Sequence, residues 1–242
     1  MKPGTTAKSS SLSIAEEAFT GPTIVSAPLR SPVHADRVER LLAAFDRFDE
    51  VETNAVLDQA IGDLSLTAFV EALILPALRD LGYRWERGEV TPAQEHFASN
   101  LIRGRFLGLG RGWGGGSGPV AILACPSGER HDLALIAFGL LLRERGWRIV
   151  FFGQDTPIFT IAEASELLDP DAVVIAAVDA RKLRAVDAEL EALATGFAVF
   201  IAGAGASQRL ARRLGAVQLE GEPTYAAGAL DAARASCSGP SS

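Results

Sequence analysis

Apolar residues recur at helical spacing over the first part of the chain, from about residue 34 onward. The stretch HADRVERLLAAFDRFD places four of them at positions i, i+3, i+4 and i+7, on one face of an amphipathic helix. These are Val38, Leu41, Leu42 and Phe45. The pattern returns in three further stretches, ETNAVLDQAIGDL, SLTAFVEALILPALRDLGYRWERG and TPAQEHFASNLIRGRFLGLG. Four helices over residues 34–109 predict a helix bundle.

Two of these helices have recognisable local signals. Pro76 lies inside the third helix and predicts a kink, because proline lacks an N–H and its ring crowds the preceding turn. Thr91 and Pro92 predict the start of the fourth helix, with the threonine as N-cap and the proline at the first helical position.

The pattern changes after the Gly-rich stretch GLGRGWGGGSGP, which predicts a linker over residues 110–118. Beyond it, five short apolar runs read VAILACP, RIVFFG, AVVIAAV, AVFIAG and AVQLEG. They alternate with the helix-like stretches 131–145, 157–168, 180–195 and 206–214. Alternation of this kind is typical of an α/β fold with a parallel sheet. We therefore expect a Rossmann-like (flavodoxin-like), doubly wound, five-stranded sheet over residues 119–235.

The two ends of the chain show no such periodicity. Residues 1–33 are rich in Ser, Thr, Pro and Ala and predict a disordered N-terminal tail. Residues 236–242 predict a flexible C-terminal tail. The expected organisation is therefore a helix bundle and an α/β domain between two tails.

Composition excludes several classes of protein. The chain has 242 residues and a net charge of −7, which argues against a nucleic-acid-binding surface. It contains no apolar run of the roughly 18 residues that a membrane span needs. The N-terminus lacks the apolar core of a signal peptide, and Cys125 and Cys237 make no disulfide framework. A cytoplasmic protein is expected.

Candidate binding residues follow the strands, because ligands of doubly wound sheets bind at the carboxyl ends of the strands. Each loop taken alone is as well explained by an ordinary turn or helix cap. Neither G-x-G-x-x-G nor a Walker A sequence is present, so a dinucleotide or ATP site is not expected. The candidates are Ser127, Gly128, Glu129 and His131 after the first strand, Gly153, Asp155 and Thr156 after the second, Ala176 and Val178 at the third, and Gly203 and Gly205 after the fourth.

One segment of the first loop matches a known signature. Residues 129–134, Glu-Arg-His-Asp-Leu-Ala, resemble the D/E-x-H-x-x-G signature of cobalamin-binding domains. The resemblance implies that His131 is the lower axial ligand of cobalt and that Glu129 accepts a hydrogen bond from the other ring nitrogen. The family's S-x-L and G-G elements correspond to Ala176–Val178 and to Gly203 and Gly205. This chain departs from the signature at Ala134, where the family has Gly, and at Ala176, where it has Ser.

A second match lies in the predicted bundle. Trp85, Glu95 and His96 are similar to the W-x9-E-H motif of CarH-type light-sensing cobalamin proteins. Without the first match, Trp85 is better explained as core filler, and Glu95 and His96 as a helix N-terminal acid with a buried polar neighbour. The resemblance implies bound adenosylcobalamin, with Trp85 packed over its adenosyl group and Glu95 and His96 lining the same upper pocket. Two departures are Glu86, where those repressors carry a cobalt-ligating His, and the lack of a MerR-like DNA-binding region in the residues before the bundle.

The resemblance implies a light sensor and not an enzyme. Photolysis of the cobalt–carbon bond would change conformation or oligomeric state, between dimer or tetramer forms, and so signal to a protein partner. DNA and membranes are not expected partners. The chain also resembles the photocobilins, which implies biliverdin as a second chromophore, although no residue here specifies a bilin site. Two alternatives stay open: a corrinoid protein of a methyltransferase system, and a cobalamin-binding antirepressor or adaptor without photochemistry.

Overall fold

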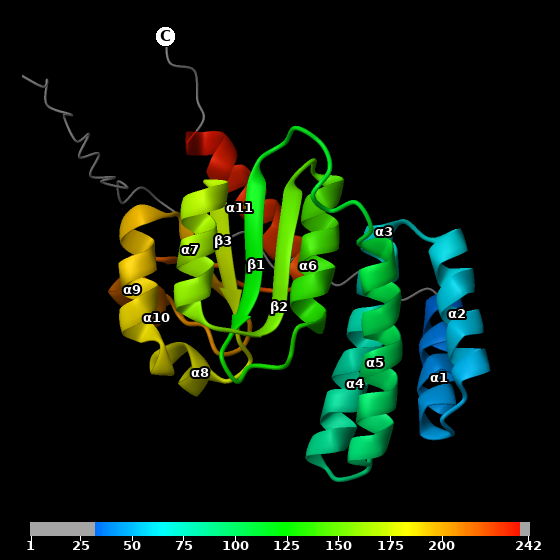
Figure 1. Cartoon of the computed structure of the whole chain (residues 1–242). Helices are drawn as coiled ribbons and strands as arrows, with labels where there is room; N and C mark the ends of the chain where they lie inside the picture. The colour runs from blue at the N-terminus through cyan, green and yellow to red at the C-terminus, as the bar shows by residue number, and fades with distance from the viewer. Residues whose placement is uncertain (1–31, 238–242) are drawn as a thin grey trace, which may run out of the picture. The chain divides into compact units, whose positions relative to one another are not determined.

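The computed structural model describes residues 32–237. The predicted tails, 1–33 and 236–242, therefore lie almost entirely outside the described residues. The first half of the described chain is helical (Figure 1). Its elements are α1 Pro32–Asp46, α2 Glu50–Asp63, α3 Leu66–Phe69, the π-helical segment η1 Val70–Ile74, α4 Leu75–Glu86 and α5 Pro92–Leu109. Because α3, η1 and α4 follow one another without a break and form one long helix, this part of the chain has four helices in space.

The π-helical segment η1 lies directly before Pro76, where the sequence predicted a kink. The N–H of Leu75 donates to the carbonyl of Val70, five residues back. A wider turn of this kind takes up the irregularity that a proline introduces into an α-helical ladder. The long helix thus continues through Pro76 with a local widening.

The last helix of this part, α5, begins with a capping box. The Thr91 side chain accepts from the backbone N–H of Gln94, and the Gln94 side chain accepts from the N–H of Thr91. The Gln94 amide also donates to the carbonyl of Asp46, at 3.1 Å, which ties the start of α5 to the end of α1. The start of the helix that holds Glu95 and His96 is therefore well determined.

The second half of the described chain is an α/β domain with one parallel sheet. Its strands are β1 Val120–Pro126, β2 Arg148–Thr156, β3 Ala172–Ala176, β4 Val199–Ala202 and β5 Val217–Gln218, in the order β2-β1-β3-β4-β5. All neighbouring pairs are parallel. The helices are α6 Leu133–Glu144, α7 Ile158–Leu168, α8 Ala180–Ala185, α9 Asp187–Gly196, α10 Gln208–Leu214 and α11 Pro223–Cys237. The predicted α/β class and flavodoxin-like strand order are confirmed.

Two helical features differ from the sequence prediction. The stretch 180–195 forms two short helices, α8 and α9, separated at Val186, which lies outside the helical region at φ −121° and ψ 22°. Helix α11 was not predicted. It is rich in alanine, so its apolar periodicity is weak, yet Ala226, Ala227 and Leu230 are buried where it packs against α6.

Successive residues of the central strands face opposite layers of helices. On β1, Ala121 and Leu123 belong to the apolar core shared with α6 and α11, whereas Ile122 and Ala124 belong to the core shared with α7, α9 and α10. Figure 1 shows α6 and α7 on opposite sides of the strands. Because side chains alternate with a period of two, this strand is apolar at every position.

The core on the α6 side also includes the bundle. Phe69, Ile102 and Phe106 are fully buried and belong to the same apolar cluster as Leu123 and Leu141. Helix α5 packs directly against α6. The bundle helices are therefore held beside the loop that joins β1 to α6, which contains His131.

No helix within residues 32–237 is both long enough and apolar enough to cross a membrane.

Candidate functional site

His131 lies on the loop between β1 and α6, at the carboxyl end of a central strand. Its side chain is 72% exposed. One ring nitrogen, Nδ1, lies 2.6 Å from Oε1 of Glu129. The ring is thus held at one nitrogen and open at the other.

Glu129 is the buried anchor of this loop, with a side chain only 2% exposed. Its Oε1 also accepts from the N–H groups of Arg130 and His131, at 2.9 and 3.0 Å. Its Oε2 accepts from the N–H groups of Val178 and Asp179, at 2.9 and 3.3 Å. Burial opposes ionisation of this carboxyl, but the hydrogen bonds from His131, Asp179 and Val178 outweigh it and hold the pKa of Glu129 below its ordinary value.

This arrangement determines the tautomer of His131. An ionised carboxylate can only accept hydrogen bonds, so Nδ1 of the ring must have the proton. In the neutral imidazole the lone pair then lies on Nε2, which has no hydrogen-bond partner among the described residues. A nitrogen lone pair held this way is suited to a metal ligand.

Cys125 lies beneath the same loop but is not a second reactive group. It is fully buried, and its Sγ lies 3.8 Å from the carbonyl oxygen of His131. Burial, reinforced by the negative charges of Asp132 and Glu129, raises the pKa of the Cys125 thiol to about 12. Because the thiolate is the reactive form of cysteine, the protonated Cys125 is unreactive and serves only as a weak hydrogen-bond donor.

The predicted residues around β2 shape the loop. The N–H of Gly128 donates to Oδ1 of Asp155 at 2.6 Å, and the N–H of Asp155 donates to the carbonyl of Glu129 at 3.0 Å. The Thr156 hydroxyl donates to the carbonyl of Gly153 at 3.4 Å. Ser127 is exposed at the turn. Gly128 and Asp155 thus join the His131 loop to the end of β2.

The glycines after β4 allow two loops to approach each other. Gly203 has φ +85°, and a Cβ there would lie 2.5 Å from the carbonyl oxygen of Ala177. At Gly205 a Cβ would lie 2.8 Å from the backbone nitrogen of Ala180. Ala176 is buried at the end of β3, and the N–H of Val178 holds Glu129. The small residues therefore let the β4 loop pack on the β3 loop, which in turn fixes the anchor of His131.

The three candidate residues of the bundle lie on α4 and α5. Trp85 is in the last turn of α4 and is 44% exposed. Glu95 and His96 are in the first turns of α5, with side chains 33% and 70% exposed. The Ser99 hydroxyl donates to Oε1 of Glu95.

One cavity brings the bundle residues and His131 together. It has a volume of about 660 Å³ and lies between α4, α5 and the loop after β1. Its walls are formed by Leu78, Leu81, Gly82, Trp85, Glu95, His96, Ser99, Asn100, Arg103, Arg130, His131, Asp132, Leu133 and Gln154. The other predicted residues, from Ser127 and Gly128 to Gly203 and Gly205, do not line it.

Among the lining residues that the sequence interpretation missed are three polar ones that bond to one another. Arg103, Asp132 and Gln154 form a hydrogen-bonded cluster in the wall. Arg103 could have been found, because it lies eight residues after Glu95 and so on the same helical face. Asp132 and Gln154 gave no signal, since a polar residue beside a strand end is ordinary.

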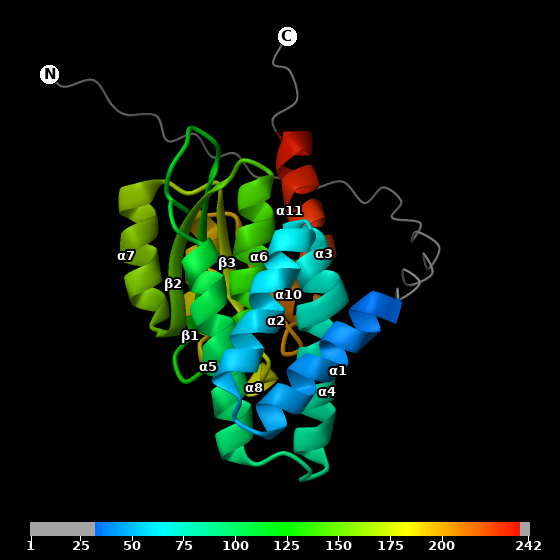
Figure 2. The same cartoon turned by 90° about the vertical axis from the view of Figure 1, so that its right-hand side faces the viewer.

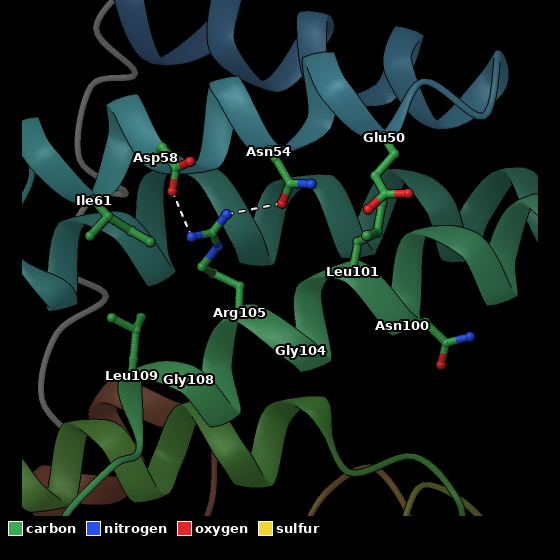
Figure 3. A pocket seen from close by; sticks show the side chains of 10 residues that line it. All are labelled: Glu50, Asn54, Asp58, Ile61, Asn100, Leu101, Gly104, Arg105, Gly108 and Leu109. Atoms are coloured by element: carbon green, nitrogen blue, oxygen red, sulfur yellow. Dashed lines mark hydrogen bonds and ion pairs between the residues drawn. The ribbon is translucent and has the colours of Figure 1, made fainter.

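A second cavity, of about 490 Å³, lies between α2 and α5 (Figure 3). These two helices lie side by side (Figure 2). Arg105 spans the cavity, with ion-pair and hydrogen-bond contacts to Asp58 at 2.6 Å and Asn54 at 2.9 Å. None of the predicted site residues lines this cavity.

A family model described as a B12 binding domain matches residues 37–106. The matched stretch covers nearly all of α1 to α5 and includes Trp85, Glu95 and His96. His131 lies outside it.

The chain is also similar to proteins of known identity. It is 33% identical over 188 residues to the HTH-type transcriptional repressor CarA of Myxococcus xanthus, covering 76% of this chain and 64% of that protein. It is 32% identical over 193 residues to the repressor CarH of the same organism, covering 77% and 64%. The chain thus spans slightly less than two thirds of the length of either relative.

A solved structure supports the fold. The monomethylamine corrinoid protein of Methanosarcina barkeri superposes with a TM-score of 0.68 at 17% identity, over 82% of this chain and 99% of that chain. At this identity the likeness concerns the fold alone. The family model and the similarity to the two repressors are matches in sequence. They support the conclusion that the chain contains a cobalamin-binding domain, similar in sequence to the corresponding part of CarA and CarH.

Proposed function

We propose that this protein is a light-sensing module that binds adenosylcobalamin with His131 as the lower axial ligand of cobalt. The observation that supports this most directly is the cavity lined by both His131 and Trp85. A flat macrocycle with a ligand on each face needs a nitrogen donor on one side and a large apolar surface on the other. The β1 loop supplies the first and α4 supplies the second.

The residues present fit this cofactor. When bound, adenosylcobalamin supplies a cobalt–carbon bond that visible light can break. His131 presents an unpartnered Nε2, and Glu129 keeps the proton on Nδ1, which makes Nε2 the donor atom.

The upper pocket belongs to α4 and α5. We assign to Trp85 the contact with the adenosyl group, to Glu95 hydrogen bonds with its ribose hydroxyls, and to His96 the rim of the pocket. Glu86 follows Trp85 and is exposed. Because it replaces the His of the CarH-type repressors, we expect a light state whose open coordination position is filled by water, His96 or Glu86.

The signal would arise from contacts made on the two sides of one cavity. Loss of the upper group would remove the contacts that we assign to Trp85 and Glu95, while His131 would keep its own. A ligand shifts a conformational equilibrium only by its differential affinity for the two states, and this asymmetric loss supplies such a difference. The readout would be a light-dependent oligomeric state or a partner contact in a non-enzymatic protein. Biliverdin and a cytoplasmic location remain predictions.

The decisive experiment is illumination of the reconstituted protein. We expect purified protein loaded with adenosylcobalamin in the dark to show a stable absorption spectrum that green light converts to that of a cobalamin without the adenosyl group. Free adenosylcobalamin at the same concentration and exposure is the control. A bound spectrum that green light leaves unchanged would show that the protein is not a light sensor.

Trp85 is expected to determine the preference for the adenosyl group. Aromatic stacking contributes about 0.5–1.5 kcal/mol, so W85A should reduce affinity for adenosylcobalamin up to about tenfold and leave methylcobalamin nearly unaffected. Isothermal titration with both cobalamins measures this. Y83A, on the same helix and also exposed, is the matched control because Tyr83 does not line the cavity. An equal loss for both cobalamins would show that Trp85 does not recognise the upper group.

The same measurement tests the alternative of a corrinoid methyl carrier. Such a protein needs an upper face that admits a methyl donor and acceptor, and it would bind methylcobalamin at least as well as adenosylcobalamin. The indole of Trp85, which lines the same cavity as His131, favours the larger upper group. An antirepressor without photochemistry would bind adenosylcobalamin but give the same partner contacts in the dark and in the light.

A further inference from the structure

A buried ion pair joins the bundle to the loop that contains His131. The Asp132 side chain is only 1% exposed, and its carboxylate accepts from Nη2 of Arg103 at 2.9 Å and from Nε at 3.1 Å. Arg103 comes from α5, and Asp132 follows His131 directly. The guanidinium therefore makes a bidentate contact, the geometry that gives arginine–carboxylate pairs their orientation.

The Asp132 carboxylate binds Arg103 instead of capping helix α6. It occupies the N-cap position of that helix, where an aspartate commonly accepts from the first backbone N–H groups, but its side chain makes no capping bond. The helix gives up this stabilisation. A buried carboxylate without a partner would be costly, so Arg103 is strongly constrained to remain beside it.

Gln154 connects this ion pair to Arg130, the residue before His131. Its amide Nε2 donates to Oδ1 of Asp132 at 3.0 Å and to the carbonyl oxygen of Arg130 at 2.5 Å. The residues before and after His131 are thus both held, one through its carbonyl and the other through its carboxylate. The three side chains of Arg103, Asp132 and Gln154, hereafter the clamp, fix the backbone from which the imidazole projects.

The clamp connects with the upper pocket through α5. Glu95, Ser99 and Arg103 are spaced four residues apart, so they lie on one face of this helix, and all three line the cavity. The Ser99 hydroxyl donates to Glu95. Helix α5 therefore holds residues of the upper pocket at its start and, two turns later, Arg103, which contacts the residue that follows His131.

We propose that Arg103 is a positioning residue that couples α5 to the cobalt-ligating loop, and that the clamp sets how well His131 reaches cobalt. The inference rests on the proposed function in that the ligand to be positioned is the lower axial His. Any shift of α5 would be passed by the Arg103 guanidinium to Asp132, and through Gln154 to the carbonyl of Arg130.

The first test needs no cofactor. In the protein without cobalamin, R103Q is expected to raise amide hydrogen exchange in the peptide spanning residues 127–133 by about tenfold, as expected for a loop released from its local contacts. R103K keeps the charge but lacks the bidentate geometry, and it should give an intermediate value. R105Q is the matched control, because Arg105 makes a similar ion pair on the same helix but reaches α2 (Figure 3).

The second test uses the cofactor. In protein labelled with ¹⁵N-histidine, loaded with adenosylcobalamin and converted to the cob(II)alamin form, the ¹⁵N splitting in the electron paramagnetic resonance spectrum reports the share of cobalt bound by His131, because the cofactor's own base gives a ¹⁴N splitting. R103Q should lower this share and weaken binding about tenfold or more, the range seen when an outer-shell partner of a metal-ligating His is removed. R103K should recover part of both, and R105Q should match the unmodified protein.

The outcomes separate the inference from the proposed function. If R103Q does not fold, R103Q/D132N removes both charges and leaves no unpaired buried carboxylate, and the same two changes are expected. Folded variants with unchanged exchange and unchanged nitrogen splitting would overturn the clamp, as would equal effects of R105Q. An unmodified protein that fails to bind adenosylcobalamin would instead overturn the proposed function, and the exchange result would still decide whether Arg103 holds the loop.

Discussion

H131A is expected to lower affinity for cobalamin by more than about a hundredfold, because removing an outer-shell partner of a metal-bound His alone costs about 10–100-fold. The ¹⁵N splitting of the cob(II)alamin form in ¹⁵N-histidine-labelled protein should disappear. Equilibrium dialysis with adenosylcobalamin and the resonance spectrum measure the two effects.

The fold should tolerate this change. The His131 ring is 72% exposed, so the free energy of unfolding should change by no more than about 0.5 kcal/mol. H34A is the control, since His34 is on α1 and does not line the cavity. Retained ¹⁵N splitting in H131A would show that another histidine ligates cobalt.

E129A is expected to be the most destabilising change at the site. It leaves the buried N–H groups of the loop without their acceptor, and one such group costs about 1–3 kcal/mol. We expect the free energy of unfolding to fall by roughly 2–4 kcal/mol, since these costs are not additive. Urea denaturation of the cofactor-free protein measures it, with E39A, an exposed glutamate on α1, as the control. A loss no larger than that of E39A would show that Glu129 does not hold the loop.

E129Q removes the charge of the Glu129 side chain but keeps its size. The amide has nearly the same shape, but its NH₂ group meets donors and cannot fix the proton on Nδ1 of His131. Affinity for cobalamin should fall about 10–100-fold. An affinity equal to that of the unmodified protein would mean that the tautomer of His131 is set in another way.

The pKa of Glu129 also predicts a dependence on pH. This pKa is lower in the folded protein than in the unfolded chain, so ionised Glu129 stabilises the fold at pH values above its ordinary pKa. That stability is lost as the pH falls from the ordinary pKa through the lowered one. Over this acidic interval the unmodified protein should lose stability more steeply than E129Q, as urea denaturation at successive pH values would show.

The sequence predicted the architecture because its periodic signals are local. The one-faced pattern at Val38, Leu41 and Phe45 and the capping box at Thr91 arise within a few turns of chain. The apolar runs are apolar at every position because both faces of the sheet are covered. Helix α11 escaped prediction since its buried face consists mainly of alanines, whose burial depends on where α6 lies.

The candidate site was predicted only in part, and the limit is again physical. Glu129 and His131 are two residues apart, so their contact is available from local chain geometry. That Trp85 shares a cavity with His131, and that Gly203 and Gly205 pack on the β3 loop and not on the cavity, depends on segments far apart in the chain.

By itself, the sequence of this protein determined the order of its strands and of the helices before α11, the loop that contains His131 and the partner of that imidazole. Only the tertiary structure decided which groups face the imidazole and what holds its backbone. Arg103 and Asp132 are separated by 29 positions, and neither is unusual in its own helix. Their contact exists because α5 packs against α6 through a shared apolar core, and the position of a helix on a sheet is set by long-range packing that no local pattern encodes.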